Sequence, residues 1–466
     1  MTVPAPFAFA HDIAKAIASG DVTARAVAEA ALARIAAVGG PINAFTDVTT
    51  ARAMEAAETV DAARDRGEPL GPLAGVPYAV KNLYDVQGLS TRAGSKINRE
   101  RKPADRDATL VTRMDAAGGV LVGALNMGEY AYDFTGENAH DGPSRNPHDV
   151  TRMSGGSSSG SGAATAAGLA PLSLGSDTNG SIRVPASLCG IFGLKPTYGR
   201  LGRGGSFPFC DSLDHLGPFA RCVTDLALTY DALQGPDERD HACAARSVEP
   251  AAAGLAAPPP RIAVLGGHFA ESTLPEAREA VARVADALGT TRTVTVDGAE
   301  AGRAAAFVIT NAESANLHLE RLRTRLDDLD PDTRDRFLAG ALLPASWYVQ
   351  AQRVRRWWAR QLALAIADVD VLIAPATPCT APLIGQKTMS LDGKEVLVRP
   401  NLGLFTQPIS CVGLPVVAAP MMASNGLPIA VQLIAKPWRE VDALRAAAAL
   451  ERAGVAAAPR PSGLDG

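Results

Sequence analysis

The chain contains 466 residues, of which 47% are hydrophobic and 20% are charged, and its formal net charge is −4 at pH 7. This composition is typical of a soluble globular protein with a sizeable core. The small negative charge gives no reason to expect nucleic acid or an anionic membrane as a direct partner.

The sequence predicts a cytoplasmic protein. Its N-terminus lacks a basic region followed by a long apolar core, so we expect no signal peptide. No apolar run approaches the ~18 uninterrupted residues of a membrane span. The six cysteines form no Cys-x-x-Cys pair: Cys189, Cys210, Cys222, Cys243, Cys379 and Cys411. Reduced, mostly buried thiols fit this wide spacing better than a disulfide framework or a zinc site.

The N-terminal part of the chain, residues 1–66, is predicted to form helices, because its apolar residues recur every three or four positions. The predicted helices cover residues 13–18, 23–38 and 51–66, and Gly39-Gly40 should end the second one. Buried strands are predicted over residues 73–80, with Lys81 at the end, and over 120–124, with a helix over 110–117 between them. A long polar loop with aromatic residues, 126–147, should follow.

The second half alternates predicted strands and helices. Strands are expected over residues 261–265, 369–375, 410–419 and 427–433, and helices over 223–234, 274–288, most of 301–367 (broken near Pro331 and Pro344) and 441–453. Residues 235–260, rich in Ala, Pro and charge, are predicted to be a surface excursion. Such alternation predicts an α/β protein with helices on both faces of a sheet.

A Gly- and Ser-rich stretch over residues 153–203 is the most distinctive part of the sequence. A flexible linker is one interpretation, but interspersed apolar runs disfavour it. A second is a G-x-S-x-G nucleophile elbow around Ser158, which needs a downstream Asp and His, although the last histidine is His318. A phosphate cradle is disfavoured, since no G-x-x-x-x-G-K-[ST] occurs and Lys195 is followed by Pro196.

A third interpretation of the stretch combines Ser157 and Ser181 with Lys81. A serine hydroxyl needs a base to become a nucleophile, and a neutral lysine can serve without histidine. Burial at the end of an apolar strand would favour the neutral form of Lys81, because the charged form loses its solvation.

Three segments carry a long and specific motif: residues 155–158 (GGSS), 175–185 (GSDTNGSIRVP) and 193–197 (GLKPT). This motif resembles that of the amidase signature family. The likeness extends from residue 74 to about residue 428 and is weakest over residues 234–368. It implies one α/β domain over residues 1–466, with a large twisted mixed sheet sandwiched between helices. The signature core would cover residues 74–225 and the second half of the sheet residues 261–466.

The resemblance also implies roles for individual residues. Ser181 would be the nucleophile, Ser157 the bridging serine after a cis Gly156–Ser157 peptide, and Lys81 the base. Backbone N–H groups of Thr178, Asn179, Gly180 and Ser181 would form the oxyanion hole.

Other positions of the motif are expected to be structural. Asp177 and Arg183 would fix the loop before and after the nucleophile rather than touch the substrate. Many relatives have Gly-Gly before the nucleophile, where this chain has Asn179-Gly180. Asn tolerates the left-handed backbone that a glycine would adopt, so we expect the oxyanion hole to survive this difference.

Within the family, two kinds of member are candidates for the activity of this chain. One is the glutaminase A subunit of aspartyl/glutamyl-tRNA amidotransferases, and the other comprises hydrolases of small carboxylated ureides such as 1-carboxybiuret, from cyanuric acid degradation. Four stretches resemble the second kind: residues 93–98, 205–209, 230–237 and 406–410. Asn425 stands where A subunits usually place an Asp, so the charge that would hold the ammonium group of glutamine is missing.

The substrate contacts are less well specified than the catalytic group. Tyr132, Tyr348 and Asn425 are candidates. Arg353, Arg355 and Arg356, with Trp347, Trp357 and Trp358 alongside, could bind a carboxylate, although a helix with solvated arginines is the preferred interpretation. We expect His215 to be a packing or hydrogen-bonding residue.

The resemblance implies no metal and no organic cofactor. It also implies assembly as a dimer or heteromer, with a small helical partner subunit.

Overall fold

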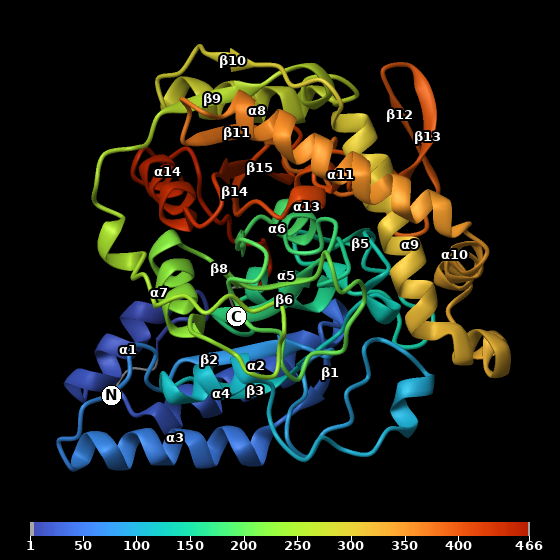
Figure 1. Cartoon of the computed structure of the whole chain (residues 1–466). Helices are drawn as coiled ribbons and strands as arrows, with labels where there is room; N and C mark the ends of the chain where they lie inside the picture. Colours follow the sequence, from blue (N-terminus) through green and yellow to red (C-terminus); the bar gives the residue numbers. More distant parts are fainter. Residues whose placement is uncertain (1–3, 465–466) are drawn as a thin grey trace.

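The computed structural model describes residues 4–464 and contains one large mixed sheet with helices packed around it (Figure 1). The order of the eleven strands is β1-β3-β2-β6-β8-β7-β14-β15-β11-β9-β10. Their bounds are β1 Phe45–Val48, β2 Pro77–Lys81, β3 Val120–Leu125, β6 Leu172–Asp177, β7 Phe192–Lys195, β8 His215–Ala220, β9 Ile262–Leu265, β10 Thr293–Val294, β11 Val371–Pro375, β14 Val416–Met422 and β15 Pro428–Ala435. The predicted α/β class and mixed sheet are confirmed.

Two short hairpins lie outside this sheet. The first joins β4 and β5, and the second, β12–β13, projects at the upper right of Figure 1. Their strands are β4 Arg145–Asn146, β5 Asp149–Met153, β12 Thr388–Leu391 and β13 Lys394–Leu397.

Helices cover the sheet along its length. The α-helices are α1 Ala10–Ser19, α2 Ala24–Ile42, α3 Thr50–Asp65, α4 Thr109–Ala116, α5 Ser159–Ala166, α6 Arg183–Cys189, α7 Val223–Leu233, α8 Pro275–Ala287, α9 Ala299–Thr324, α10 Pro331–Ala341, α11 Ala345–Ala365, α12 Val398–Asn401, α13 Gln407–Val412 and α14 Glu440–Arg452. Helices α2, α3 and α4 pack on β3, α5 on β6, and α6, α8 and α14 on β15. Every residue of β2, β3, β6 and β15 is buried, so both faces of the sheet are covered.

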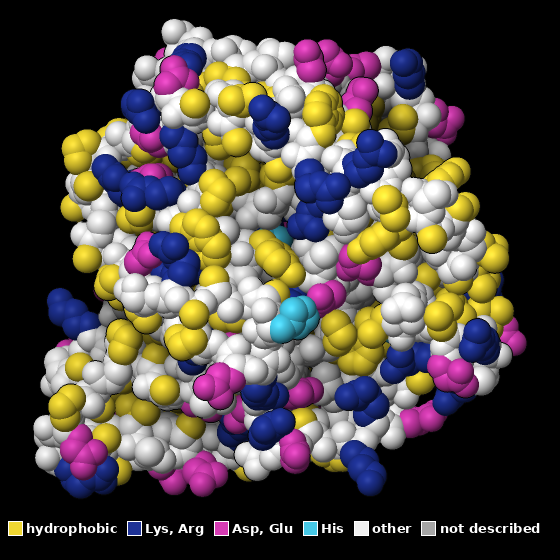
Figure 2. Space-filling model, in the orientation of Figure 1, with side chains coloured by type: hydrophobic (Ala, Val, Ile, Leu, Met, Phe, Trp, Pro, Cys, Tyr) yellow, Lys and Arg dark blue, Asp and Glu magenta, His cyan; other side chains and the backbone are white. Residues whose placement is uncertain are grey.

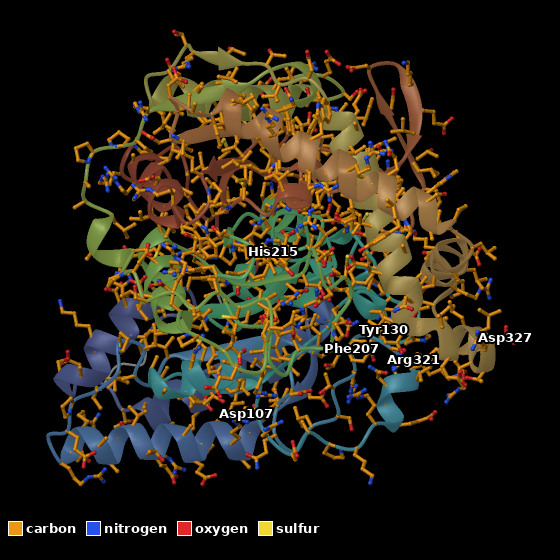
Figure 3. All side chains as sticks on the ribbon, in the orientation of Figure 1. Asp107, Tyr130, Phe207, His215, Arg321 and Asp327 are labelled. Carbon is orange, nitrogen blue, oxygen red and sulfur yellow. The ribbon has the colours of Figure 1, made fainter. Side chains whose placement is uncertain are left out.

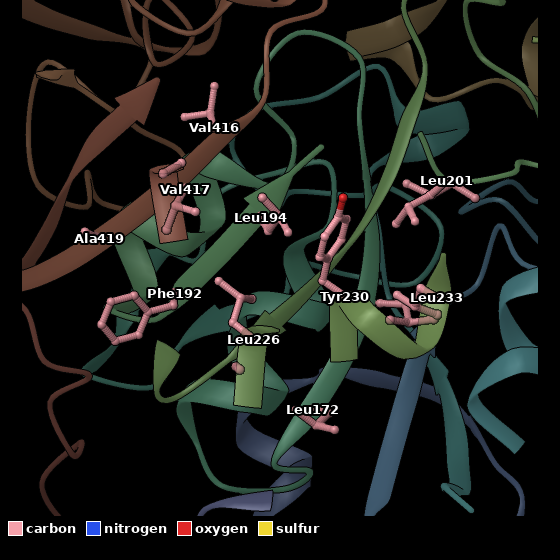
Figure 4. Packing of buried hydrophobic residues seen from close by; sticks show 14 of the residues in the cluster. Leu172, Phe192, Leu194, Leu201, Leu226, Tyr230, Leu233, Val416, Val417 and Ala419 are labelled. Carbon is pink, nitrogen blue, oxygen red and sulfur yellow. The ribbon is translucent and has the colours of Figure 1, made fainter. Parts of the chain in front are cut away.

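Apolar side chains from distant segments form the core. Figure 4 shows Leu226 and Tyr230 of α7 gathered near Phe192 and Leu194 of β7, and all four are buried. Helix α7 and strand β7 therefore pack together although strand β8 lies between them in the chain. Burial of such apolar area is the main favourable contribution to folding.

Most predicted elements are confirmed within a few residues, including the helices of residues 301–367 with their breaks at Pro331 and Pro344. Three predictions were wrong. Helix α2 continues through Gly39-Gly40 to Ile42, and Asn43 ends it in the left-handed conformation. Residues 73–75 form a turn and Val76 is irregular, so the strand begins only at Pro77. Residues 410–412 belong to helix α13 rather than to a strand.

None of the helices in the described residues is both long and apolar enough to cross a bilayer. Figure 2 shows basic and acidic side chains interspersed over the visible face. Residues 235–260 contain only one short 3-10 helix, Ala252–Gly254, and their role as a surface excursion stays a prediction.

Candidate active site

Strand β2 places Lys81 in the centre of the molecule. The strand lies between β3 and β6 and runs parallel to both, and Lys81, its last residue, is fully buried. Lys81 Nζ donates to three hydroxyl oxygens: Ser157 Oγ at 2.7 Å, Ser176 Oγ at 2.9 Å and Ser158 Oγ at 3.1 Å. No carboxylate is bonded to it among residues 4–464, so its partners are neutral hydroxyls.

These surroundings lower the pKa of Lys81 toward neutral pH, where a catalytic base must exchange its proton. Burial lowers the pKa of Lys81 to about 7, while the more distant carboxylates of Asp214, Asp177 and Asp133 act in the opposite direction. A pKa in this range makes the neutral amine, which accepts a proton, accessible near neutral pH. The arrangement can therefore serve as a general base near neutral pH.

Ser157 and Ser158 occupy the turn before helix α5, and they differ in their contacts. The Gly156–Ser157 peptide is cis, as the resemblance implied. Ser158 Oγ donates to the carbonyl oxygen of Ser176 at 3.0 Å and accepts from its backbone N–H at 3.2 Å. Ser158 thus joins α5 to strand β6, and it does not line the large cavity described below. This arrangement disfavours Ser158 as the nucleophile of a G-x-S-x-G elbow.

Ser181 lies in the loop between β6 and α6 and is 3% exposed. It lines a cavity of about 380 Å³. Among residues 4–464, its hydroxyl makes no hydrogen bond with any other group. The structure therefore joins Lys81 and Ser157 directly and leaves the Ser181 hydroxyl available at the cavity wall.

A buried ion pair shapes the Ser181 loop. Arg183 Nη2 and Nε donate to the two carboxylate oxygens of Asp177 at 2.9 and 3.0 Å. Asp177 Oδ2 also accepts from the backbone N–H of Ile182 at 3.1 Å. Burial alone would raise the pKa of Asp177, but Arg183 outweighs it and holds the pKa below its usual range. Neither side chain lines the cavity, in agreement with the structural role expected from the sequence.

The backbone before Ser181 does not require the left-handed conformation of Asn179. The positive φ lies at Gly180, at +144°, and Asn179 does not adopt the left-handed conformation. The backbone N–H groups of residues 178–181, the predicted oxyanion hole from Thr178 to Ser181, donate to no hydrogen bond among the described residues. Free N–H groups beside a nucleophile can stabilise an oxyanion. Thr406 Oγ1 fixes the loop by donating to the carbonyl oxygen of Asn179 at 2.7 Å.

Replacing Gly180 with alanine is expected to lower kcat about 100-fold or more, the effect of losing an oxyanion donor. A Cβ on Gly180 would lie 2.2 Å from Thr406 Oγ1, and side chains rarely adopt its φ, so the N–H groups must move. The variant would be compared with Gly40→Ala, because nothing lies within 4 Å of a Cβ at Gly40 and activity should not change. Wild-type turnover by Gly180→Ala would show that the loop geometry is unimportant.

The cavity beside Ser181 has aromatic, amide and charged walls. Its lining includes Tyr132, Phe134, Asn179, Thr310 and Arg336. Asn179 is 7% exposed, and its Nδ2 donates to Thr310 Oγ1 at 2.8 Å, while its Oδ1 has no partner among the described residues. A substrate N–H group could satisfy this oxygen.

Only one of the three predicted substrate contacts lines this cavity. Tyr132 does, with its hydroxyl donating to Asn311 Oδ1. Tyr348 lies outside it and donates to Glu313 Oε1 at 2.9 Å. Asn425 is in the exposed turn between β14 and β15, where its Nδ2 donates to Thr380 Oγ1 at 2.9 Å. The geometry therefore favours Tyr132 over the other two.

The arginines of α11 also lie outside the cavity: Arg353, Arg355 and Arg356. Arg355 donates to the carbonyl oxygens of Cys411 at 2.7 Å and Ser212 at 2.9 Å. His215 is buried, with Nδ1 2.6 Å from the carbonyl oxygen of Leu213, and burial lowers its pKa well below the usual value. Its contacts agree with the packing and hydrogen-bonding role expected (Figure 3).

The loop that carries Tyr132 is anchored next to the cavity. Tyr130 packs on Phe207 with 5.4 Å between ring centroids, and the Arg321 guanidinium lies 5.5 Å from the Tyr130 ring centroid (Figure 3). Both Tyr130 and Ala131 have a positive φ, at 48° and 63°. This turn directs the following residue, Tyr132, into the cavity wall.

Sequence reasoning missed several groups at this site. Ser176, which contacts Lys81, lies within the motif, but serines there are too frequent to single one out. Phe134, Thr310 and Arg336 also line the cavity, and Thr310 and Arg336 fall in the segment where the family likeness is weakest. Alternation of charged and apolar residues on a helix does not distinguish a cavity residue from a solvated one.

The comparison with protein families agrees with this geometry. Residues 26–444 match the family model described as Amidase. AtzE, a 1-carboxybiuret hydrolase subunit from Pseudomonas sp. (strain ADP), is 54% identical over 454 residues, which cover 96% of this chain and 98% of that protein. The A subunit of the glutamyl-tRNA(Gln) amidotransferase from Moorella thermoacetica is 35% identical over 478 residues, covering 95% of this chain and 96% of that protein.

Solved structures give the same result. An s-triazine catabolic enzyme, described with an unexpected vestigial protein complex, has a TM-score of 0.95 and 54% identity, covering 97% of this chain and 100% of that chain. The 6-aminohexanoate cyclic dimer hydrolase complexed with substrate has a TM-score of 0.87 and 30% identity, covering 99% and 100%. The likeness therefore extends over almost the whole chain, including the site.

Proposed function

The chain belongs to the amidase family, and we propose that it hydrolyses a small carboxylated ureide, with 1-carboxybiuret as its substrate and ammonia as a product. The observation that carries this proposal is the direct contact of buried Lys81 with Ser157, together with the free Ser181 hydroxyl at the cavity wall. Ser181 is the nucleophile, Ser157 the proton relay and Lys81 the base. Hydrolysis of amide C–N bonds is the activity of the family.

The first step forms the acyl-enzyme. Neutral Lys81 accepts a proton from Ser157, which in turn takes the proton of Ser181, and Ser181 Oγ attacks the carbonyl carbon of the terminal amide. The N–H groups of the Asn179–Ser181 backbone stabilise the negative charge on the carbonyl oxygen. The relay then returns the proton to the amide nitrogen, the C–N bond breaks and ammonia leaves.

The second step uses water in place of Ser181. Lys81 accepts a proton from water through Ser157, and the hydroxide attacks the carbonyl carbon of the acyl-enzyme. The bond to Ser181 Oγ breaks, Ser181 regains a proton, and the former amide leaves as a carboxylate. This scheme is balanced with water alone, so it includes no metal and no organic cofactor.

The relative that acts on 1-carboxybiuret supports this substrate, since 54% identity over 96% of the chain includes the motif segments. The alternative is the glutaminase activity of an amidotransferase, for which the matched relative is 35% identical. Asn425 lies outside the cavity that Ser181 lines, so its lack of charge does not discriminate between the two substrates as the sequence suggested. The difference in identity between the two relatives is what favours the ureide.

We place the enzyme in the cytoplasm, as a dimer or larger assembly that includes a small helical subunit. The solved relative described with a protein complex supports an assembly of this kind.

Ammonia release from 1-carboxybiuret and from glutamine, offered side by side, tests the function. The protein would be purified after co-expression with a neighbouring small helical subunit. We expect kcat/KM for the ureide to exceed that for glutamine by at least 100-fold, because the carboxylates of Asp133, Glu137 and Asp332 at the cavity wall are already paired with Arg399 and do not compete for the ammonium group of glutamine. Preferential turnover of glutamine would contradict the proposal and assign the chain to an amidotransferase.

A further inference from the structure

One buried polar atom at the wall of the Ser181 cavity has no partner. Among residues 4–464, Asn179 is the cavity-lining residue whose side chain contains a buried oxygen, Oδ1, without a hydrogen bond. The residue as a whole is 7% exposed. Buried acceptors in folded proteins are normally satisfied, so an open oxygen at a cavity wall points to a donor on the ligand.

The orientation of Asn179 is fixed although its Oδ1 is open. Asn179 Nδ2 donates to Thr310 Oγ1, on helix α9, at 2.8 Å. The backbone carbonyl oxygen of Asn179 accepts from Thr406 Oγ1 at 2.7 Å, so the side chain and the backbone are both held. A group that is already held in place loses little side-chain entropy when it binds a ligand. Asn179 therefore provides a preformed acceptor two residues before Ser181.

Other oxygens at this cavity already have partners within the protein. Arg399 pairs with the three carboxylates of the cavity wall: Asp133, Glu137 and Asp332. The side-chain amide oxygens of Gln386 and Gln407 each accept one hydrogen bond within the protein. In the described part of the chain, Asn179 Oδ1 is thus the buried acceptor that a substrate donor can reach without competing with a protein group.

A ureide supplies a donor for this oxygen. The reacting carbonyl carbon of 1-carboxybiuret is bonded to the leaving NH2 group on one side and to an N–H group on the other, where a carboxamide such as glutamine has CH2. The leaving nitrogen has to face the Ser157 relay that protonates it, and no hydrogen bond joins Asn179 to Ser157 or Lys81 within residues 4–464. The N–H group on the other side remains as the donor for Asn179.

We propose that Asn179 Oδ1 accepts from the N–H group next to the reacting carbonyl carbon and so selects ureides over carboxamides. This inference rests on the proposed function, because it takes Ser181 as the reacting group at the same cavity. The N–H group stays bonded to the carbonyl carbon in the acyl-enzyme, so the contact is kept through both steps. A carboxamide leaves Oδ1 buried without a donor, and that unsatisfied acceptor disfavours it.

Two ligands of the same shape can test this contact. N-carbamoylglycine and succinamic acid both have a terminal amide and a carboxylate, and they differ only in the N–H group that is CH2 in succinamic acid. Their Kd values would be measured by calorimetry on the Ser181→Ala protein, purified as for the activity assay, alone and combined with Asn179→Ala or Asn179→Asp. Asn425→Ala is the matched control, because Asn425 Nδ2 also donates to a threonine hydroxyl, Thr380 Oγ1 at 2.9 Å, but lies outside the cavity.

We expect Ser181→Ala to bind N-carbamoylglycine about 10-fold or more tightly than succinamic acid, the effect of leaving a buried acceptor without a donor. Asn179→Ala should reduce this preference to below about threefold, because Oδ1 is gone. Asn179→Asp should retain it, since an acceptor oxygen remains and the two ligands have the same charge, so that repulsion cancels in the ratio. Asn425→Ala should leave the preference unchanged.

An unchanged preference in a folded Asn179→Ala protein would overturn the inference, as would equal binding of the two ligands before any change at Asn179. If Asn179→Ala fails to fold, Asn179→Gly decides by the same criterion, because it removes the same oxygen and glycine tolerates any backbone conformation. A preference that is lost in Asn179→Asp as well would assign it to the amide nitrogen and would also count against the inference.

Turnover by the wild type distinguishes this inference from the proposed function. If the wild type hydrolyses 1-carboxybiuret, Asn179→Ala should lower kcat/KM for it about 10-fold or more. If the wild type hydrolyses no ureide but Ser181→Ala still prefers N-carbamoylglycine through Asn179, the ureide contact stands and the proposed substrate fails. If 1-carboxybiuret is hydrolysed equally well with and without the Asn179 side chain, the inference fails and the proposed function stands.

Discussion

Replacing Ser181 with alanine is expected to reduce ammonia release from the ureide by about 10⁴-fold or more, because the nucleophilic route is then closed. The Ser181 hydroxyl makes no hydrogen bond among the described residues, so its removal breaks no contact within the fold. The Tm should therefore stay within about 2 °C of the wild type. Initial rates of ammonia release and thermal melts of both proteins would check these values.

Ser161→Ala provides the control for this experiment. Ser161 is also buried, and its hydroxyl donates to the carbonyl oxygen of Leu174 at 3.0 Å, away from the cavity. That variant should lose about 1 kcal/mol of stability, the contribution of a typical hydrogen bond, and retain its turnover. Near-wild-type turnover by Ser181→Ala would remove Ser181 as the nucleophile.

The pH dependence of kcat/KM should follow the ionisation of Lys81. Since the neutral amine is the active form and burial places its pKa at about 7, kcat/KM should rise tenfold per pH unit below about pH 7 and level off above it. Lys81→Met should lower the rate about 10³-fold and abolish this rise. The exposed Lys96, which pairs with Asp328, provides the control, since Lys96→Met should retain the profile. A wild-type profile in Lys81→Met would exclude Lys81 as the base.

The lowered pKa of Lys81 also reduces the free energy of unfolding. The unfolded chain keeps a proton on this lysine up to its ordinary pKa of 10.5, and the folded protein only up to about 7. The unfolded state thus binds more protons between these values, and below pH 7 the penalty is on the order of 5 kcal/mol. Lys81→Met removes this penalty and should therefore raise the Tm at pH 7, although the loss of the three hydrogen bonds of Lys81 reduces the gain. The gain in Tm should vanish above about pH 10.5. A Tm lowered equally at every pH would contradict this account.

The sequence was sufficient to predict the centre of the molecule. The strand that ends at Lys81 and the segments around Ser157 and Ser181 are buried. Their small residues let these segments pack closely against one another. Their motif is long, so the contact between Lys81 and Ser157 and the cis peptide at Ser157 could both be anticipated. The helices of residues 301–367 were also predictable, because two prolines mark their breaks.

The cavity wall could not be predicted in the same way. Arg336 and Thr310 come from helices α10 and α9, and what they face depends on how these helices pack rather than on local sequence. Strand β8 was missed for a related reason: it is buried on both faces and contains His215 and Pro218, which weaken a strand pattern. The close approach at Gly180 was also hidden, because Thr406, which lies where a Cβ on Gly180 would stand, is more than two hundred residues away in the chain.

Mass spectrometry of the enzyme quenched during turnover tests the central claim most directly. The wild type would be mixed with 1-carboxybiuret, quenched in acid within a single turnover and digested. We expect the mass of one acyl group on the peptide that contains Ser181, and none in the Ser181→Ala protein. An acyl group on Ser157 or Ser158, or ammonia release with no adduct at any time point, would contradict the account.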